Sequence, residues 1–265
     1  MWSRILNIAG WTIGSVSMFV LLVAAVSTSH NAVLKNVVVT IDYADQNFFI
    51  DKEEVEETVS DLGYGLDSTK LDDIDPRKIE VILENNAFIE EAQVYKQLNG
   101  YLNIDVKIRQ PILRVFNRAG NSIYIDNYGV FMPLSRKYSA RTPIANGYIN
   151  MDVTQLVGLN VNDLEQYMDH PQIKLMADLY EVASTCSKSE FWKSQFNQFY
   201  VNAQGELELI PRVGDHQVII GDPSDLDKKL HKLELFYEKG LNKTGWNEYK
   251  IINLKFTNQV VCTKS

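Results

Sequence analysis

The sequence predicts an α+β protein that consists of a single N-terminal transmembrane helix and two folded domains outside the cytoplasm. Three observations lead to this prediction. A long run without charged residues begins at Ile5, and a strand–helix–helix–strand–strand pattern follows over residues 36–110. Short strands separated by turns, with two longer helices, fill residues 111–265. The second domain is therefore predicted to be a mostly antiparallel β domain with flanking helices.

The composition is that of a folded chain and excludes several classes of protein. Of the 265 residues, 45% are hydrophobic and 23% are charged, so wholesale disorder is excluded. The formal net charge of -8 argues against a general nucleic-acid binder, which needs a basic face to displace counterions. Two cysteines, Cys186 and Cys262, are too few for a disulfide framework or a four-cysteine zinc site. Whether these two pair with each other is left open.

The first uncharged run is long enough to span a membrane. Ile5 to Val26 contains no charged residue, and at ~1.5 Å per residue a helix of this length covers a ~30 Å hydrocarbon core. We expect a transmembrane helix over 5–27, residues 1–4 in the cytoplasm and a linker over 28–35. The alternative is a cleaved signal peptide, although its apolar core usually has only ~7–15 residues. In both cases the remaining chain lies outside the cytoplasm.

The first external domain is predicted over residues 36–110. Its strands and helices are expected at 36–43, 51–62, 75–87, 89–97 and 101–109. Asp51 and Asp75 are the expected N-caps of the two helices, and Pro76 suits the first helical position of the second. Asn99-Gly100 is a hairpin turn between the last two strands. Both helices are expected on one face of a three-stranded sheet.

The second external domain is predicted over residues 111–265. Its strands are expected at 112–117, 122–126, 129–133, 196–202, 206–211, 216–221, 249–256 and 259–263, with an extended segment over 140–149. Helices are expected over about 172–187 and from the turn at 222–224 to about Lys239, and Gly240 is expected to end the second of them.

The sequence contains no recognisable catalytic, cofactor or metal motif. It lacks the nucleophile-elbow, zinc-protease, phosphate-loop and dinucleotide patterns, and its four histidines have no ligand-like spacing. Acidic residues cluster at 51–57 and 71–75, where two helices begin, so capping explains them better than cation binding. We therefore predict no catalytic residues, no cofactor and no metal.

Several local segments resemble those of a known family, in the same order. They are Asn85–Val94, Arg109-Gln110-Pro111, Tyr124-Ile125-Asp126 followed by Gly129-Val130-Phe131, and Ile252–Phe256 followed by Val260-Val261. Together with the predicted anchor, this order resembles the FtsQ/DivIB family of bacterial cell division proteins, most closely its Bacteroidetes-type members. The resemblance implies that residues 36–110 form a POTRA (polypeptide-transport-associated) domain. Lys264 stands where some relatives carry an aromatic residue, and 171–195 resembles an insertion.

The resemblance implies a non-catalytic scaffold of the division complex, the divisome. Such a protein is anchored in the inner membrane at the septum, with its N-terminus in the cytoplasm and its bulk in the periplasm. Its expected partners are the small FtsB/DivIC-like and FtsL-like division proteins, and its POTRA domain would contact other division proteins. Neither a small-molecule substrate nor nucleic acid is expected.

The expected partner-binding site is a terminal edge strand, whose unpaired backbone groups can accept an extended segment. By similarity to the family's partner surface, the predicted contact residues are Phe256, Asn258, Gln259, Val260 and Val261. Lys264, Lys229 and Lys232 are expected to add charge contacts to an acidic partner. The alternative for Phe256, Val260 and Val261 is ordinary core packing.

Two other functions are compatible with the sequence. One is a POTRA-containing export or outer-membrane assembly factor, although such proteins usually carry several POTRA units or a membrane barrel. The other is an anchored enzyme that acts on the cell wall, which lacks support from any nucleophile, metal cluster or acid–base pair.

Overall fold

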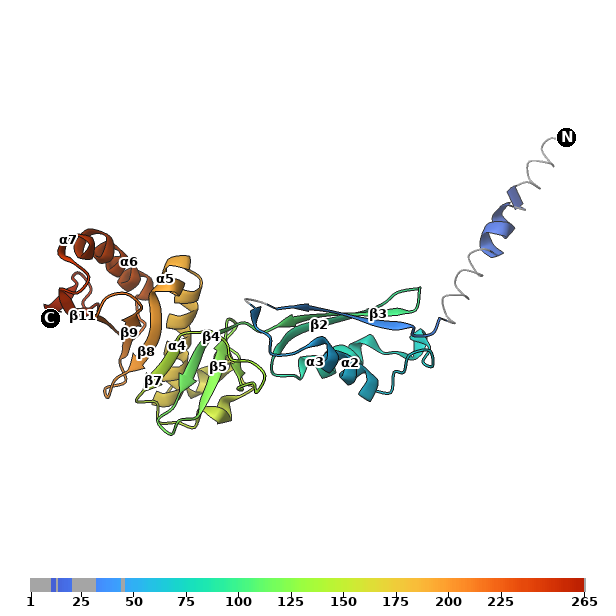
Figure 1. Ribbon diagram of the computed structural model, residues 1–265, viewed down its shortest axis with the longest axis horizontal. Coiled ribbons are helices and arrows are strands. Elements are labelled where there is room, and N and C mark those ends of the chain that lie inside the picture. Colours follow the sequence, from blue (N-terminus) through green and yellow to red (C-terminus); the bar gives the residue numbers. More distant parts are fainter. Residues whose placement is uncertain (1–10, 13, 21–31, 44–45, 265) are drawn as a thin grey trace. The chain divides into compact units, whose positions relative to one another are not determined.

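The computed structural model describes residues 11–12, 14–20, 32–43 and 46–264, and the chain forms two units, Met1–Ile108 and Arg109–Ser265 (Figure 1). Of the predicted transmembrane helix, residues 11–12 and 14–20 are helical, and the other residues of 5–27 lie outside the described residues, as do residues 1–4. In the described ranges no helix combines the length and the apolar character that crossing a membrane requires.

The first unit has the predicted order of elements. They are β1 (Asn36–Asp42), α2 (Lys52–Asp61), the 3-10 turn η2 (Leu71–Asp73), α3 (Pro76–Glu84), β2 (Ile89–Lys96) and β3 (Tyr101–Ile108). The strand order is β1-β3-β2, with β1 parallel and β2 antiparallel to the central β3. Figure 1 shows α2 and α3 on the same face of this sheet.

Local signals in the sequence account for this unit. Asp51 caps α2 by accepting a hydrogen bond from the Glu54 amide at 3.0 Å, and Asp75 accepts one from the Lys78 amide at 3.4 Å at the start of α3. Gly100 takes a φ of +97° in the β2–β3 turn, a conformation that glycine adopts without strain. The predicted caps and hairpin are therefore confirmed.

The second unit contains a nine-stranded sheet. Its strands are β4 (Pro111–Phe116), β5 (Ser122–Asp126), β6 (Phe131–Met132), β7 (Ile144–Gly147), β8 (Phe196–Val201), β9 (Leu207–Pro211), β10 (Gln217–Gly221), β11 (Tyr249–Asn253) and β12 (Val261–Lys264). Its helices and helical turns are η3 (Val153–Leu156), η4 (Val161–Tyr167), α4 (Pro171–Ser187), α5 (Glu190–Gln195), α6 (Leu226–Phe236), η5 (Tyr237–Leu241) and α7 (Asn242–Thr244). The strand order is β12-β11-β10-β9-β8-β7-β4-β5-β6.

This sheet is mixed, but five of its eight neighbour pairings are antiparallel, which agrees with the expectation of a mostly antiparallel domain. Three of its eight neighbour pairings are parallel, namely β4 with β7, β7 with β8, and β10 with β11. Two of these pairings follow from helical crossovers, because α4 and α5 connect β7 to β8 and α6 connects β10 to β11. A strand–helix–strand connection brings the second strand back in the same direction.

The inner face of the sheet packs against α4 and α6 in one continuous core. Leu179 of α4 and Leu233 of α6 are fully buried, as are Leu209, Val218 and Ile252 from three neighbouring strands. This packing fixes the positions of β10 and β11, and thereby of β12, which follows them in the sheet.

The prediction that Gly240 ends the long helix was wrong. The chain passes through Gly240 in a wider π-type turn, η5, and continues through α7. The helical path stops at Gly245, which takes a φ of +105°. Gly240 lies within that turn against the ring of Phe236, which is 3.0 Å from where a Cβ would stand.

Candidate functional site

The sheet of the second unit ends in β12, which pairs on one side only with β11. The two strands are antiparallel, with Asn253 opposite Val261 and Ile251 opposite Thr263. Within the described ranges, no strand or loop pairs with the outer side of β12. An exposed row of backbone donors and acceptors can accept an added strand.

The backbone groups that point outward can be assigned from the hydrogen bonds of β11. The Leu254 amide, directly after β11, donates to the carbonyl of Ile219 in β10 at 2.9 Å. Because successive residues of a strand point their backbone groups to alternate sides, those of Asn253 face β12. Val261 lies opposite Asn253 and faces it in return. The N–H and C=O of the next residue, Cys262, therefore point away from the sheet.

The opposite edge of the sheet, at β6, is covered by the chain itself. The Phe131 amide donates to the Leu159 carbonyl at 2.9 Å, and the Phe131 carbonyl accepts from the Gly158 amide at 2.8 Å. A bridge between Val130 and Asn160 extends this contact. The two ends of the sheet thus differ, since residues 158–161 cover β6, whereas in the described part of the chain β12 has a neighbour on one side only.

The predicted contact residues lie at or next to the open edge. Phe256 is 45% exposed and Val261 is 39% exposed, while Asn258, Gln259 and Lys264 are exposed. Val260 is partly buried and packs against the core. Phe256 and Val261 therefore present apolar surface to solvent, whereas the side chain of Val260 serves packing in part.

Lys229 and Lys232 contact acceptors of their own domain. Lys229 is only 7% exposed, and its Nζ donates to the Asp222 carbonyl at 2.8 Å. Lys232 Nζ donates to the carbonyls of Phe256 at 2.6 Å and Thr257 at 3.3 Å. Burial lowers the pKa of Lys232, and the nearby charge of Lys229 lowers it further. Lys232 thus holds the loop that leads into β12, whereas Lys229 holds the turn between β10 and α6.

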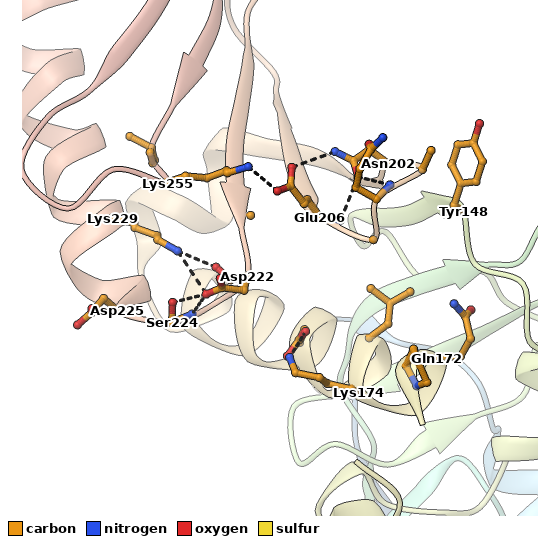
Figure 2. Close-up of a pocket in the computed structure, with 18 of the residues that line it drawn as sticks. Tyr148, Gln172, Lys174, Asn202, Glu206, Asp222, Ser224, Asp225, Lys229 and Lys255 are labelled. Atoms are coloured by element: carbon orange, nitrogen blue, oxygen red, sulfur yellow. Dashed lines mark hydrogen bonds and ion pairs between the residues drawn. The ribbon is translucent and has the colours of Figure 1, made fainter. Parts of the chain in front are cut away.

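A groove with a volume of about 660 Å³ lies beside the loop that leads into β12. Besides the pair of Lys174 with Asp178, Figure 2 shows two groups of paired charges in it. Lys255 binds Glu206, and this contact lowers the pKa of the Glu206 carboxyl. In the other group, Lys229 and Ser224 both contact Asp222, whose pKa is lowered first by the Ser224 hydroxyl. These pairs fix the groove walls.

The edge is more basic than the chain as a whole. Residues 249–264 contain three lysines and no aspartate or glutamate, and two of the lysines, Lys250 and Lys264, remain besides Lys255, which is paired with Glu206. The whole chain carries a formal net charge of -8. This local excess of positive charge favours an acidic partner segment at this edge.

An aromatic cluster supports the strands behind the edge. His216 is 2% exposed, and its Nε2 lies 2.8 Å from the Tyr237 hydroxyl. The rings of Tyr237 and Trp246 lie 5.0 Å apart beside it. Burial lowers the pKa of His216, and the Trp246 backbone and Asp215 oppose this effect in part. The imidazole is therefore held in its neutral form.

We expect this histidine to make the second unit less stable in acid. In the unfolded chain His216 binds a proton at the ordinary histidine pKa of about 6.5, whereas in the folded chain it does so only at a lower pH. The free energy of unfolding therefore falls as the pH drops through and below about 6.5. The slope is at most about 1.4 kcal/mol per pH unit. Urea unfolding between pH 7.5 and 5 measures it. His216→Gln should flatten the profile, whereas His231→Gln, at an exposed site, should not.

The described residues form no metal cluster, and the one cysteine in β12, Cys262, has no disulfide partner. No cluster of three or more His, Cys, Asp or Glu side chains suited to a metal occurs in the described part of the chain. Cys186 and Cys262 are both free. Burial raises the pKa of the Cys186 thiol to about 12, so it is not reactive at neutral pH.

A strand–helix–helix–strand–strand unit followed by a mixed sheet with one open edge defines a two-domain class of β-rich protein. The family model "FtsQ/DivIB, C-terminal related" matches residues 110–263, which is more than half of the chain, and the "POTRA-like domain" model matches residues 32–107. The chain therefore belongs to the FtsQ/DivIB family.

A curated relative agrees with this assignment. The cell division protein FtsQ of Rhodothermus marinus is 24% identical over 195 residues. These residues are 71% of this chain and 65% of that relative, so the match covers less than two thirds of the relative's length.

Proposed function

We propose that this chain is a non-catalytic scaffold of the bacterial divisome that binds an extended partner segment by strand addition to β12. The observation that carries the proposal is the contrast between the two ends of the sheet, since residues 158–161 cover β6, whereas none of the residues that the structure describes pairs with the outer side of β12. The expected partners are the FtsB/DivIC-like and FtsL-like division proteins. Family membership supports a role in cell division.

Each predicted residue has a role in this proposal. Lys232 acts as a positioning residue, because its ammonium group holds the carbonyls of Phe256 and Thr257 in the loop that leads into β12, and Lys229 holds the Asp222 carbonyl in the turn before α6. The residues proposed to contact the partner directly are Phe256, Asn258, Gln259, Val260, Val261 and Lys264. Backbone pairing along β12 would set the register of the added strand, and the exposed side chains would select its sequence.

The proposal includes the location of the protein. Residues 5–27 would anchor the chain in the inner membrane at the septum, with residues 1–4 in the cytoplasm and the domains over 36–110 and 111–265 in the periplasm. The support is the absence of charge from Ile5 to Val26. A short linker over 28–35 would join the anchor to the first domain.

The outward N–H of Cys262 provides a selective test. Cys262→Pro removes this donor and adds a ring at the edge, but leaves the inward groups of Val261 and Thr263 paired with β11. We expect recovery of the FtsB/DivIC-like and FtsL-like proteins with the full chain from membranes to fall about tenfold, the effect of ~1.4 kcal/mol.

Cys262→Ser is the matched control, because it keeps the backbone donor and should bind as the unchanged chain does. Normal recovery with the proline variant would contradict strand addition at β12. An equal loss of partner recovery with Cys262→Ser would mean that the partner contacts the Cys262 side chain and not its backbone N–H. In both variants, unchanged urea unfolding of the second unit excludes general damage.

A further inference from the structure

The three-stranded sheet of the first unit has one face that its helices do not cover. On that face Val38, Asn103 and Tyr95 form one row across β1, β3 and β2, because Asn103 is opposite both of the others. Val38 is 36% exposed and Tyr95 is 46% exposed. Tyr101, the residue two positions before Asn103, is 37% exposed. The row and its neighbour make an aromatic, apolar surface that faces solvent.

Asn103 in the middle of this row is not fully satisfied. Its side chain is only 8% exposed, and its amide nitrogen is buried without a hydrogen-bond partner in the described ranges. A buried donor without an acceptor is costly, and such groups in folded proteins usually have a specific reason. A bound segment that brings an acceptor to this point would remove that cost.

The same face becomes acidic away from this row. Asp105 and Asp42 lie two and four residues farther along β3 and β1. The one lysine in these rows, Lys107, is already paired with Glu90. Residues 32–108 contain 7 Lys and Arg and 17 Asp and Glu, a net charge of 7 − 17 = −10. A partner for this face must therefore be basic.

The β2 edge of this sheet is less available to an added strand than the open face is to a helix. Glu80 of α3 accepts a hydrogen bond from the Val94 amide of β2 at 2.9 Å, and Glu84 accepts one from the Ala92 amide at 3.3 Å. Two donors that an added strand would use at β2 are thus already held by carboxylates. A helix needs no such donors, because its backbone groups are paired internally, and helices pack well on sheet faces.

We propose that the open face of the first unit docks a basic amphipathic helix of a partner protein. One apolar side chain of that helix sits against Val38 and Tyr95, and an acceptor reaches the Asn103 amide. Its lysine or arginine side chains face Asp105 and Asp42. The four residues from Val38 to Asp42 span about 13 Å of strand, so the apolar anchor and the cationic end of the helix are separated by a similar distance.

The negative charge of this face favours a basic helix over a second copy of this unit and over an anionic lipid surface. A second copy of this unit would bring net charges of −10 together, and an anionic lipid surface would meet the same repulsion. Neither pairing provides the cations that the acidic end of the face requires. The proposal is independent of strand addition at β12, which belongs to the other unit.

Photocrosslinking in cells that produce the full chain tests the proposal. A benzoylphenylalanine residue replaces Thr40, which is exposed on this face between Val38 and Asp42. We expect a crosslinked protein in which the mapped segment has an apolar stripe and lysine or arginine on a helical pattern. The combined change Asp42→Lys and Asp105→Lys should lower its yield at least fivefold, and Val38→Ser should lower it similarly.

Two controls make the outcome decisive. The same crosslinker at Glu57, exposed on α2 at the helical layer, should not give this adduct. Cys262→Pro should leave the adduct unchanged while it weakens binding at β12. The proposal is overturned by the absence of an adduct from position 40, by an adduct with lipid, with a second copy or with an acidic or extended segment, or by a yield that charge reversal does not lower.

Discussion

Removal of residues 257–265 is expected to abolish binding of the FtsB/DivIC-like and FtsL-like proteins. The deletion takes away β12 and the exposed Asn258, Gln259 and Val261, so the partner loses both its backbone ladder and its side-chain contacts. With a few ladder hydrogen bonds at ~0.5–1.5 kcal/mol each, affinity should fall by about a hundredfold or more. Recovery of the partners with the full chain from membranes measures the loss.

The deletion exposes β11 as a new edge, but this strand is a poor replacement. The pairing of β11 with β12 is irregular between Tyr249 and Ile251, so a strand added there would meet a break in register. Its outward side chains also differ from those of β12. Strand addition depends on the register of alternating side chains, so a partner selected by β12 should not bind β11 with comparable affinity.

The rest of the molecule should survive this deletion. The core residues of the first unit and the α4 and α6 layer of the second lie outside the removed segment. Lys232 keeps the Phe256 carbonyl as an acceptor and loses only that of Thr257. Far-UV circular dichroism and urea unfolding check this, and a folded truncated chain that retains its partners would contradict the proposed site.

The local signals of the sequence were sufficient to predict the first unit. Asp51 and Asp75 act within one turn of their own helices, and Gly100 acts within its own hairpin, so each signal is readable without the fold. The alternation of Leu102 and Ile104 with polar residues likewise predicted the buried face of β3. These elements succeed because local preference and tertiary packing agree.

The parallel strand pairings of the second unit could not be predicted from local sequence signals. The sequence indicated most of the strands, but the parallel pairings depend on how α4 and α6 cross the sheet. The order strand–helix–strand was a usable signal for these crossovers. The short α5, capped by Ser189, was missed because six residues carry too little helical periodicity to be recognised.

The candidate site was predictable in position but not in detail. The sequence pattern predicted a terminal strand and the exposed residues next to it, but it did not predict the hydrogen-bond acceptors of Lys232. Its acceptors at Phe256 and Thr257 lie 24 and 25 residues along the chain and meet it only because α6 packs beside the β11–β12 loop. Likewise, the outward direction of the Cys262 backbone follows from strand pairing and cannot be read from residue type.

The largest loss of stability is expected from Asp126, at the turn between β5 and β6. Its side chain is fully buried and accepts hydrogen bonds from Arg109 at 2.9 Å and from the amides of Tyr128 at 2.9 Å and Val130 at 2.7 Å. Burial raises the pKa of Asp126, while these hydrogen bonds and the arginine charge oppose the rise. The carboxylate thus joins the start of the second unit to its first hairpin.

Asp126→Ala should destabilise the second unit by about 3–5 kcal/mol, because it leaves a largely buried arginine charge and two amides without their acceptor. Arg109 has little capacity to adapt, since its Nε is already buried without a partner in the described ranges. Asp126→Asn should cost less, because an amide oxygen can still accept from the turn.

The matched control is Asp152→Ala, which removes an exposed aspartate that caps η3 through the Thr154 amide and should cost only about 1 kcal/mol. Urea unfolding followed by tryptophan fluorescence measures all three variants, since Trp192 and Trp246 both lie in the second unit. Equal losses from Asp126→Ala and Asp152→Ala would mean that the buried ion pair contributes no more than an ordinary cap. A much larger loss from Asp126→Ala than from Asp152→Ala would show that the buried contacts of Asp126 stabilise the β5–β6 turn. This turn lies at the covered end of the sheet, opposite the open edge of β12.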